Sequence, residues 1–446
     1  MAILDHRLTD SEYARQFSDI HPAFENRDAA LAEANRCLFC YDAPCMKSCP
    51  TGINVPKFIR QIATDDLKGA AGTIFQSNIL GGGCSRVCPV EKLCEGACVY
   101  NLMEEKPISI ARLQRLPTEK AIADRWPLFT RKPATGRKVA VVGAGPAGLS
   151  AAHVLSREGV DVTIYEKEPR GGGLMTYGIA AYKVTPEFCE AEVDYILSLG
   201  GITIRYGCAL VREIFLDELR STYDAVFLGF GVGLARQLNI PGETLHGVVD
   251  AIHFIHELRD KGFPSVPVGD HVAVIGMGMT AIDAATQARR LGAGRVTLVY
   301  RRTQAEMPCT QAELDLAKLD GCQLLWLAAP KEIVGHEGNV TALVCHSMEL
   351  GPPDGSGRRY PVETGETVTL EVDMVIKAAG QLPYTELVEA TAITHDRGRI
   401  AVTGSDTNLP GVFAGGDCVN GGKEVVDAVQ AGKDGAAGIL EYLKLS

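Results

Sequence analysis

The sequence lacks an excess of basic residues, a membrane-length apolar run and a secretory leader. Lysine and arginine number 44 against 55 aspartate and glutamate residues, so the formal net charge is −11. That balance argues against a nucleic-acid binder, which needs a basic surface. The longest apolar stretches, such as 139–155, are broken by Gly and Pro, so no membrane span is expected. The start, MAILDHRLTD, has no basic segment followed by an apolar run, which predicts a cytoplasmic protein.

The sequence also lacks a strong bias toward any class of residue. Hydrophobic residues make up 46% and charged residues 22% of the chain, which excludes a disordered, collagen-like or coiled-coil protein. The length of 446 residues predicts two or three domains.

Cysteine, by contrast, is concentrated. Eight of the 14 cysteines lie between Cys37 and Cys98, where an even spread would place about two. In a reducing compartment such a group favours metal ligation over disulfides. The spacings are typical of iron–sulfur ligands, whose runs end in Cys-Pro: Cys37-x2-Cys40-x4-Cys45-x3-Cys49-Pro50 and Cys84-x3-Cys88-Pro-x4-Cys94-x3-Cys98. Two structural zinc sites are the alternative, although zinc would leave the chain without an electron exit.

The chain has three regions of different pattern. Residues 1–132 carry the cysteines and helical periodicity, as in VPKFIRQIATDDLKGAAGTIFQS, and predict an all-α iron–sulfur domain. A strand, glycine turn, helix and strand then follow at 138–168, and the pattern recurs at 271–302. The predicted fold is therefore α/β, with two Rossmann-like nucleotide-binding domains after the all-α domain. The predicted boundaries are 137–265 with 375–446 for the FAD domain and 266–374 for the NAD(P) domain.

The first glycine loop is Gly143-Ala-Gly145-Pro146-Ala147-Gly148, between an apolar strand and a helix. The glycines allow a tight turn and let a pyrophosphate approach the backbone at the helix N-terminus. Glu166 follows the next strand, 23 residues after Gly143, where a carboxylate binds ribose hydroxyls. This complete unit predicts a dinucleotide site.

The second glycine loop is Gly276-Met-Gly278-Met279-Thr280-Ala281. Arg301 and Arg302 stand where the first unit has its acid. Guanidinium groups there suit the 2′-phosphate of NADPH, although two solvated arginines after a strand are the simpler interpretation. NADPH is favoured and NADH stays open.

Two nucleotide units predict a flavoprotein that takes hydride from a nicotinamide. The segment GVFAGGDCV, 411–419, resembles the one that closes the FAD site in flavoproteins with two dinucleotide domains, with Asp417 bonded to FAD. Ala378-Ala379-Gly380-Gln381 resembles the connector between the two domains. No Cys-x2-Cys pair occurs after residue 98, so electrons must leave by a route other than a redox disulfide.

Three stretches carry a wider resemblance: CLFCYDAPCMKSCPTGINVPKFI, CSRVCPVEKLCEGACVYNLMEEKPISIARLQR and GGGLMTYGIAAYKV. They resemble the N-terminal half of dihydropyrimidine dehydrogenase, which in bacteria is a separate PreT-type subunit. Glutamate synthase small subunits are close second relatives. The resemblance extends from about residue 30 to the end of the chain.

This resemblance implies two [4Fe–4S] clusters. One takes Cys37, Cys40, Cys45 and Cys98, and the other takes Cys49, Cys88, Cys94 and Gln114, which lies 16 residues after Cys98 at the family's glutamine position. Counting thiolates alone makes Cys84 the eighth ligand instead. The 16-residue offset favours Gln114, and both remain candidates.

The resemblance also implies nucleotide-binding residues. For FAD these are Gly143, Gly145, Pro146, Ala147, Gly148, Glu166, Lys167, Gly173, Leu174, Lys183, Gly416, Asp417, Glu424 and Val425. The connector residues Ala379 and Gly380 are also expected to bind a cofactor. For the nicotinamide nucleotide they are Gly276, Gly278, Met279, Thr280, Ala281, Arg301 and Arg302. The stretch TQAEMPC departs from the family pattern, because it lacks the further basic residue that grips the 2′-phosphate in the animal enzymes.

The predicted function is an NAD(P)H-oxidising FAD and iron–sulfur subunit. It would pass electrons, in a hetero-oligomer, to a PreA-type FMN-containing partner that reduces uracil or thymine. No side chain is predicted to act as an acid–base catalyst, since the cofactors carry the chemistry. A glutamate synthase small subunit is one alternative, and a cluster-bearing redox sensor or scaffold without steady turnover is another.

Overall fold

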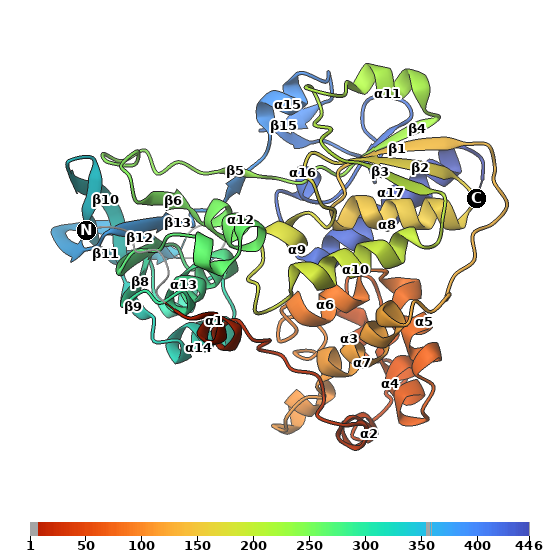
Figure 1. Ribbon diagram of the computed structural model, residues 1–446, viewed down its shortest axis with the longest axis horizontal. Coiled ribbons are helices and arrows are strands. Elements are labelled where there is room, and N and C mark those ends of the chain that lie inside the picture. The colour runs from red at the N-terminus through yellow and green to blue at the C-terminus, as the bar shows by residue number, and fades with distance from the viewer. Residues whose placement is uncertain (1–7, 354–356, 358, 446) are drawn as a thin grey trace. The chain divides into compact units, whose positions relative to one another are not determined.

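The computed structural model describes residues 8–353, 357 and 359–445, and they divide into two compact units. The larger unit holds residues 20–176, 183–234 and 382–445. The smaller unit holds residues 8–19, 177–182 and 235–381 (Figure 1). No helix in the described part of the chain is long and apolar enough to span a membrane.

The larger unit begins with short helices, drawn in red and orange in Figure 1. They are α2 (Arg27–Asn35), α3 (Pro44–Lys47), α4 (Val55–Ala63), α5 (Leu67–Ser77), α6 (Gly81–Val87), the 3-10 helix η1 (Val99–Met103) and α7 (Ile110–Ala123). Helix α4 begins after Asn54, whose side-chain oxygen accepts the Lys57 N–H at 3.1 Å. Its residues Phe58, Ile59 and Ile62 are buried, as the predicted amphipathic pattern requires. The predicted all-α start is confirmed.

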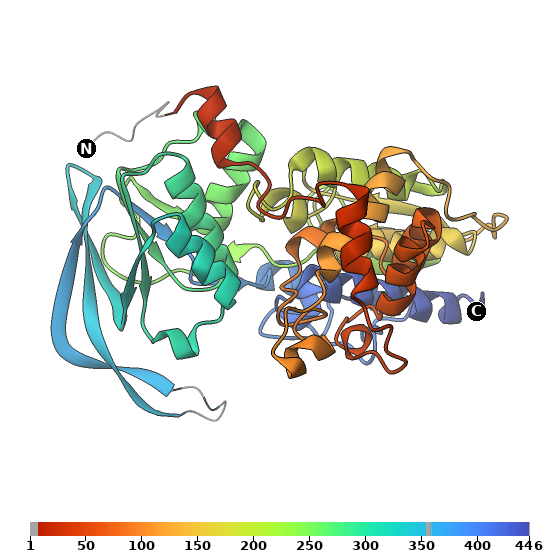
Figure 2. The same cartoon turned by 90° about the horizontal axis from the view of Figure 1, so that it is seen from below.

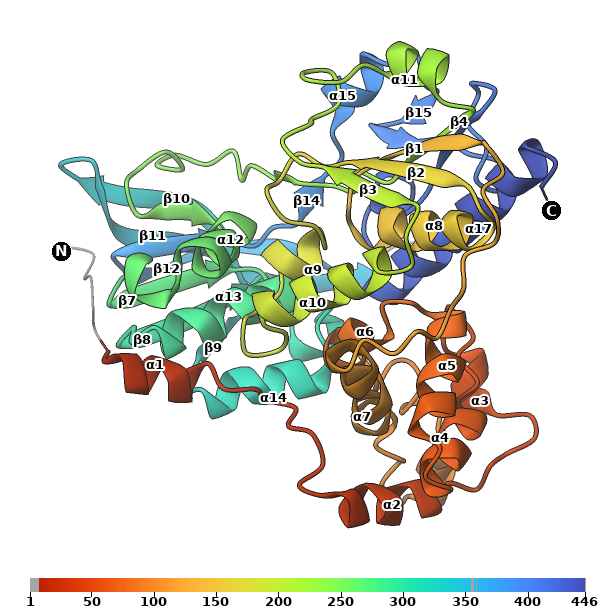
Figure 3. The ribbon, with the colours of Figure 1, turned by 45° about the vertical axis from the view of Figure 1, so that its right-hand side comes forward.

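A five-stranded parallel sheet follows in the larger unit, in the order β17-β4-β1-β2-β3. The strands are β1 (Lys138–Val142), β2 (Asp161–Tyr165), β3 (Ile202–Arg205), β4 (Ala225–Leu228) and β17 (Val412–Ala414). Helices α8 (Pro146–Arg157) and α17 (Val425–Tyr442) lie together on one face (Figure 3). A cluster on the other face includes Leu216, Leu219 and Val388. Burial on both faces explains the continuous apolar run of β1.

The larger unit also contains shorter elements, several of which contribute residues to that cluster. They are α10 (Pro186–Leu197), α11 (Leu216–Thr222), α15 (Thr385–Glu389), α16 (Asp417–Asn420), β15 (His395–Asp396) and β16 (Arg399–Ile400). Helix α9 (Leu174–Tyr177) and the strands β5 (Leu234–Ala235) and β14 (Gln381–Leu382) lie where the chain passes from one unit to the other.

The smaller unit repeats the parallel plan with a sheet in the order β6-β13-β7-β8-β9. These strands are β6 (Val248–Asp250), β7 (His271–Ile275), β8 (Arg295–Tyr300), β9 (Gln323–Trp326) and β13 (Met374–Lys377), with helices α12 (Ala251–Lys261), α13 (Met279–Arg290) and α14 (Gln311–Leu319) and 3-10 turns η2 (Phe263–Ser265) and η3 (Gln304–Glu306). An antiparallel sheet of β10 (Ala328–His336), β11 (Asn339–Pro353) and β12 (Arg359–Glu371) adjoins it (Figure 2). The predicted α/β class with two Rossmann-like domains is confirmed.

Two short segments far from 235–381 in the sequence belong to the smaller unit. Helix α1 (Asp10–Gln16) is followed by Phe17, whose ring stacks on Phe263 at 3.8 Å between centroids. Segment 177–182 packs on α13, where Asp283 accepts the Ala180 N–H at 3.1 Å and the Tyr182 hydroxyl lies 2.5 Å from that of Thr286.

Candidate functional site

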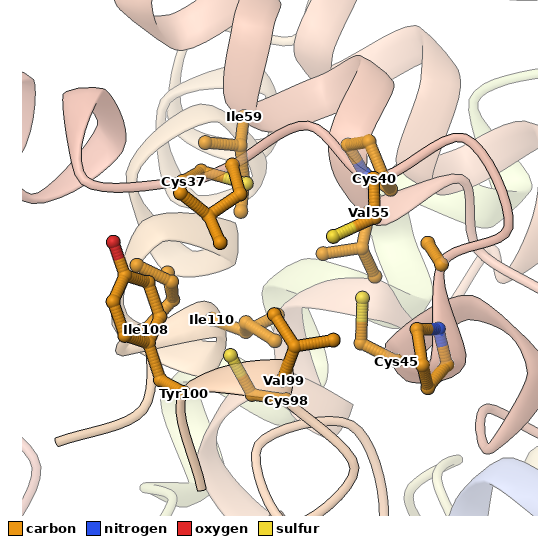
Figure 4. A pocket seen from close by; sticks show the side chains of 14 residues that line it. Cys37, Cys40, Cys45, Val55, Ile59, Cys98, Val99, Tyr100, Ile108 and Ile110 are labelled. Carbon is orange, nitrogen blue, oxygen red and sulfur yellow. The ribbon is translucent and has the colours of Figure 1, made fainter. Parts of the chain in front are cut away.

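Four of the clustered cysteines line one cavity in the all-α part of the larger unit, here named the first cavity. Cys37 and Cys40 follow α2, Cys45 lies on α3, and Cys98 directly precedes η1. Their thiol groups face the same space (Figure 4). Apolar side chains from α4, η1 and the segment leading into α7 complete the wall: Val55, Ile59, Val99, Ile108 and Ile110.

The electrostatics of the first cavity suit a cationic metal group. Burial raises the pKa of the Cys37 thiol. Burial, together with the neighbouring Cys37 and Cys98 thiols, raises the pKa of Cys45 to about 12. Thiols packed this closely resist ionising together, because each thiolate repels the next. Iron compensates that repulsion when it ligates the thiolates, so the donor set fits an iron–sulfur cluster.

A second cavity of similar size holds the remaining cysteines of the group. The two cavities have nearly the same volume. Cys49, Cys84, Cys88, Cys94 and Gln114 all line the second cavity, so five donors surround a space that needs four. In the part of the chain that the structure describes, no three His, Cys, Asp or Glu side chains are placed to share one metal ion.

Gln114 and Cys84 hold different hydrogen bonds in the second cavity. Gln114 lies in α7 but is buried rather than solvated, and its Nε2 donates to the Gly81 carbonyl at 2.7 Å. Its Oε1 is the atom with the chemistry of a metal ligand. Cys84 is buried on α6, and its Sγ accepts a hydrogen bond from Asn78 Nδ2 at 3.2 Å. A hydrogen bond with Cys84, together with burial, raises the pKa of Cys88.

The first glycine loop joins β1 to α8 in the larger unit. Gly143 has φ +100°, and a Cβ there would lie 2.6 Å from the Gly229 carbonyl oxygen. A Cβ on Gly148 would lie 1.9 Å from the Gly143 oxygen. Both positions therefore require glycine. Pro146 and Ala147 begin α8, whose free N–H groups face the loop as a pyrophosphate site demands.

Glu166 lies beside this loop, immediately after β2. Its Oε2 accepts the Ala144 N–H at 2.6 Å, and its Oε1 accepts the Glu168 N–H at 2.9 Å. Burial raises the pKa of this carboxyl group, while those two N–H bonds favour its ionised form. The structure thus holds an acceptor against the turn that the predicted dinucleotide would enter. The neighbouring Lys167 donates to the Tyr384 hydroxyl at 3.1 Å.

Two of the other predicted flavin residues, Gly173 and Gly416, lie close to the same loop. Gly173 approaches Gly145 so closely that its Cβ would lie 2.8 Å from the Gly145 Cα, and Leu174 follows it. From the C-terminal segment, a Cβ on Gly416 would lie 3.0 Å from the Ala147 Cβ. The residues Asp417, Glu424 and Val425 lie at the starts of α16 and α17 in the same unit. Burial raises the pKa of Asp417, and Lys183 is buried in that unit.

The second glycine loop joins β7 to α13 in the smaller unit. Gly276 has φ +138°, and a Cβ there would lie 2.5 Å from the Ala378 oxygen. The connector residues Ala379 and Gly380 follow directly, and Gly380 accepts the Arg236 N–H at 3.1 Å. Gly278 precedes α13, whose first residues are Met279, Thr280 and the buried Ala281.

Two arginines follow β8, but their surroundings differ. Arg301 is exposed. Arg302 is half-buried, and its Nε donates to the Arg359 carbonyl at 2.9 Å. Arg359 begins β12, and its Nη2 lies 2.7 Å from Glu306 Oε1 within TQAEMPC. The guanidinium of Arg359 therefore lies near the end of β8, although Arg359 is 57 residues from Arg302 along the chain. The local sequence around Arg302 gives no sign of it.

Two further residues of the second cavity were not predicted from any sequence pattern. Asn78 is fully buried and lines the cavity through its bond to Cys84. Val426 reaches the same cavity from α17, directly after the predicted flavin residue Val425. Neither belongs to a ligand spacing, and only the folded chain brings α17 against the cysteines.

Two family models match the chain. One is described as pyridine nucleotide-disulphide oxidoreductase and matches residues 137–432. The other is described as dihydropyrimidine dehydrogenase domain II, 4Fe-4S cluster, and matches residues 13–126. The predicted cofactors, FAD with a nicotinamide nucleotide and 4Fe–4S, are thereby confirmed.

Individual proteins that are similar to this chain support the two family matches. Subunit PreT of the NAD-dependent dihydropyrimidine dehydrogenase of Salmonella typhimurium is 36% identical, over 93% of this chain and 94% of the relative. The glutamate synthase [NADPH] small chain of Escherichia coli is 34% identical, over 96% of this chain and 94% of the relative. The solved structure of FprA from Mycobacterium tuberculosis is 22% identical, with a TM-score of 0.60 over 70% of this chain and 85% of that chain, which shows the fold.

Proposed function

The chain belongs to the pyridine nucleotide-disulphide oxidoreductase family, and from that premise we propose that it delivers electrons from NAD(P)H to an FMN-containing partner that reduces uracil or thymine. It is an NAD(P)H-dependent oxidoreductase with FAD and 4Fe–4S. The observation that carries the proposal is the pair of cysteine-lined cavities in the same compact unit as the first glycine loop. Such cavities give a flavoprotein without a redox disulfide an outlet for single electrons.

The residues of the chain divide the work between them. Gly143 and Gly276 open the two loops that would hold the pyrophosphates, Glu166 would bind the FAD ribose, and Arg301 would bind the ribose end of the nicotinamide nucleotide. Bound there, FAD would supply the chemistry that converts the hydride of the nicotinamide into single electrons for the clusters. The protein positions these groups, and no side chain is assigned an acid–base role.

The two cavities occupy different places on the proposed route. Val426 connects the flavin stretch at the start of α17 to the wall of the second cavity. The second cavity therefore lies at the flavin end of the route, and the first cavity at the outlet. The proposed ligands are Cys49, Cys88, Cys94 and Gln114 in the second cavity and Cys37, Cys40, Cys45 and Cys98 in the first.

The isolated chain provides the first test. Loaded with FAD and iron, it should oxidise NAD(P)H with ferricyanide as acceptor and leave uracil unchanged. Addition of the FMN-containing partner co-purified from the native host should then produce dihydrouracil. Uracil reduction by the chain alone would contradict the division of labour, and a chain that never oxidises NAD(P)H would favour a sensor or scaffold.

A glutamate synthase small subunit is the second candidate, because that relative matches over almost the same length. The same co-purification separates the two. A complex that forms glutamate from glutamine and 2-oxoglutarate, and leaves uracil unchanged, would establish the second candidate and reject the first.

The ligand of the second cavity has its own test. Gln114 is proposed as ligand through Oε1, with Cys84 held by Asn78 instead. Gln114→Ala should lower the iron content or shift the EPR spectrum of one cluster, whereas Cys84→Ala should leave four irons in each cluster. Loss of iron in Cys84→Ala alone would reverse the assignment.

A further inference from the structure

Exposed apolar side chains gather on the two segments that line the first cavity. The structure describes eleven large hydrophobic residues that are exposed, and five of them belong to these segments. Tyr41 is fully exposed, Leu102 is 87% exposed and Met103 56%, with Leu38 at 51% and Met46 at 37%. Isolated exposed apolar residues are ordinary, but a group of this kind marks an interaction surface.

The group is continuous with the wall of the first cavity. Leu38 lines the cavity and is half exposed, so the wall of the first cavity reaches the surface at this side chain. Tyr41 and Met46 follow on the segment that supplies Cys40 and Cys45, and Leu102 and Met103 end η1 after Cys98. None of the eleven exposed residues lines the second cavity, whose wall includes the buried Val426 of α17.

We propose that Leu38, Tyr41, Met46, Leu102 and Met103 form the docking surface for a redox subunit that accepts electrons from the first cavity. The occupant is a protein with its own redox cofactor, because a cluster in a cavity whose wall reaches the surface passes electrons to a centre that is brought close to that wall. Tyrosine and methionine are enriched at protein interfaces, where they bury large areas. The exposed Glu104 and Glu105 follow Met103 and favour basic residues on the partner.

This inference rests on the proposed function in one respect, which is that electrons leave the chain for a partner protein. It holds for a pyrimidine-reducing acceptor and for a glutamine-dependent one. A complex that fails to reduce uracil would reject the proposed function and leave the docking surface standing. If substitutions in this surface left electron transfer to the partner unchanged, the docking surface would be rejected and the proposed function would stand.

The test compares holoprotein variants with the acceptor subunit that co-purifies from the native host. Tyr41→Asp, Leu102→Asp and the double variant should raise the KM for that acceptor, by roughly 30-fold in the double variant. Iron content and the rate with ferricyanide should not change. The matched control is Leu319→Asp, which alters an equally exposed leucine (83%) on α14 of the smaller unit and should leave the KM within about twofold.

A second measurement does not depend on any variant. Hydrogen exchange of residues 38–46 and 99–105 should slow when the acceptor binds, and raised salt should weaken the complex. Protection elsewhere in the chain with none at these segments would overturn the proposal. So would a surface that instead joins two copies of this chain, seen as a dimer that the aspartate variants dissociate while transfer to the acceptor stays intact.

Discussion

The two glycine loops of this chain are built alike and differ at two points. Each follows a buried parallel strand and opens a 12-residue helix, α8 or α13. The third loop position is Gly148 in the larger unit and Ala281 in the smaller one. The second strand is followed by the buried Glu166 in one and by Arg301 and Arg302 in the other. The strand–loop–helix plan is thus shared, whereas the packing of the loop and the side chains after the second strand differ between the units.

The packing difference has a visible cause. A Cβ on Gly148 would lie 1.9 Å from the Gly143 oxygen, and one on Gly432 of α17 would lie 2.1 Å from the Ala147 oxygen. Helix α8 is therefore pressed between the loop and α17, with no room for a methyl group on either side. The loop before α13 accommodates the Ala281 side chain, which is fully buried there.

The largest effect is expected from Gly148→Ala. The added methyl group must displace the Gly143 carbonyl, and this strain should weaken FAD binding by roughly 100-fold. The flavin absorbance of the purified protein measures it. The matched change Ala281→Gly should cost about 1 kcal/mol in helix stability and keep FAD bound. Equal flavin loss in both variants would contradict the packing difference.

Glu166→Gln comes next. The change removes a charged acceptor that now holds the Ala144 and Glu168 N–H groups. Hydrogen bonds to charged groups contribute about 2 kcal/mol each, so FAD affinity should fall by roughly 30-fold. Titration of the apoprotein with FAD gives the affinity. The KM for the nicotinamide nucleotide should not move, and a larger effect there than on FAD would refute the assignment of Glu166.

The helices after the two glycine loops are also expected to differ in how pH affects their contribution to folding stability. His153 is buried in α8, and burial with the nearby Arg157 charge lowers its pKa to about 3. The unfolded chain takes up this proton below about pH 6.5 while the folded chain does not, so stability falls as the pH drops through that value. Between about pH 7 and pH 5 the loss is about 2 kcal/mol.

The counterpart of His153 in α13 is Thr286, which cannot titrate in this range. His153→Thr should therefore flatten the dependence of the melting temperature on pH, whatever constant loss of packing it adds. Melting curves of wild type and variant at both pH values provide the comparison. Parallel curves would show that His153 does not carry the acid sensitivity.

The smallest effect concerns the choice of nucleotide. Arg301 is exposed and available to a 2′-phosphate, so Arg301→Ala should raise the KM for NADPH by about 10-fold and that for NADH by less than about twofold. Arg302→Ala should do less, because its Nε already bonds to the Arg359 carbonyl. Steady-state kinetics with both nucleotides decide this. Equal changes for NADH and NADPH would show that Arg301 does not contact the phosphate.

The glycine loops and the cysteine ligand spacings could be predicted from the sequence because each depends on residues close together along the chain. Gly143 to Gly148 and Cys37 to Cys49 each specify a short stretch of backbone, and the predicted relationship and fold class are confirmed on that basis. The domain boundaries and the individual binding residues stay predictions.

Contacts between distant segments could not be predicted. Arg359 arrives beside Arg302 through the pairing of β11 with β12, and Val426 reaches the second cavity through the packing of α17. The stacking of Phe17 on Phe263 likewise assigns residues 8–19 to the smaller unit without any repeat or spacing in the sequence.

Strand β17 and helix α17 have a consequence for how the protein is made. The cysteines of both cavities emerge from the ribosome more than 300 residues before Asp417, and domains fold as they are synthesised. Until residues 412–426 are synthesised, β4 lacks its neighbour β17 and the second cavity lacks Val426 from its wall. The cysteines are therefore synthesised long before the proposed flavin site is complete, and a chain released early has all eight of them but lacks β17 and α17.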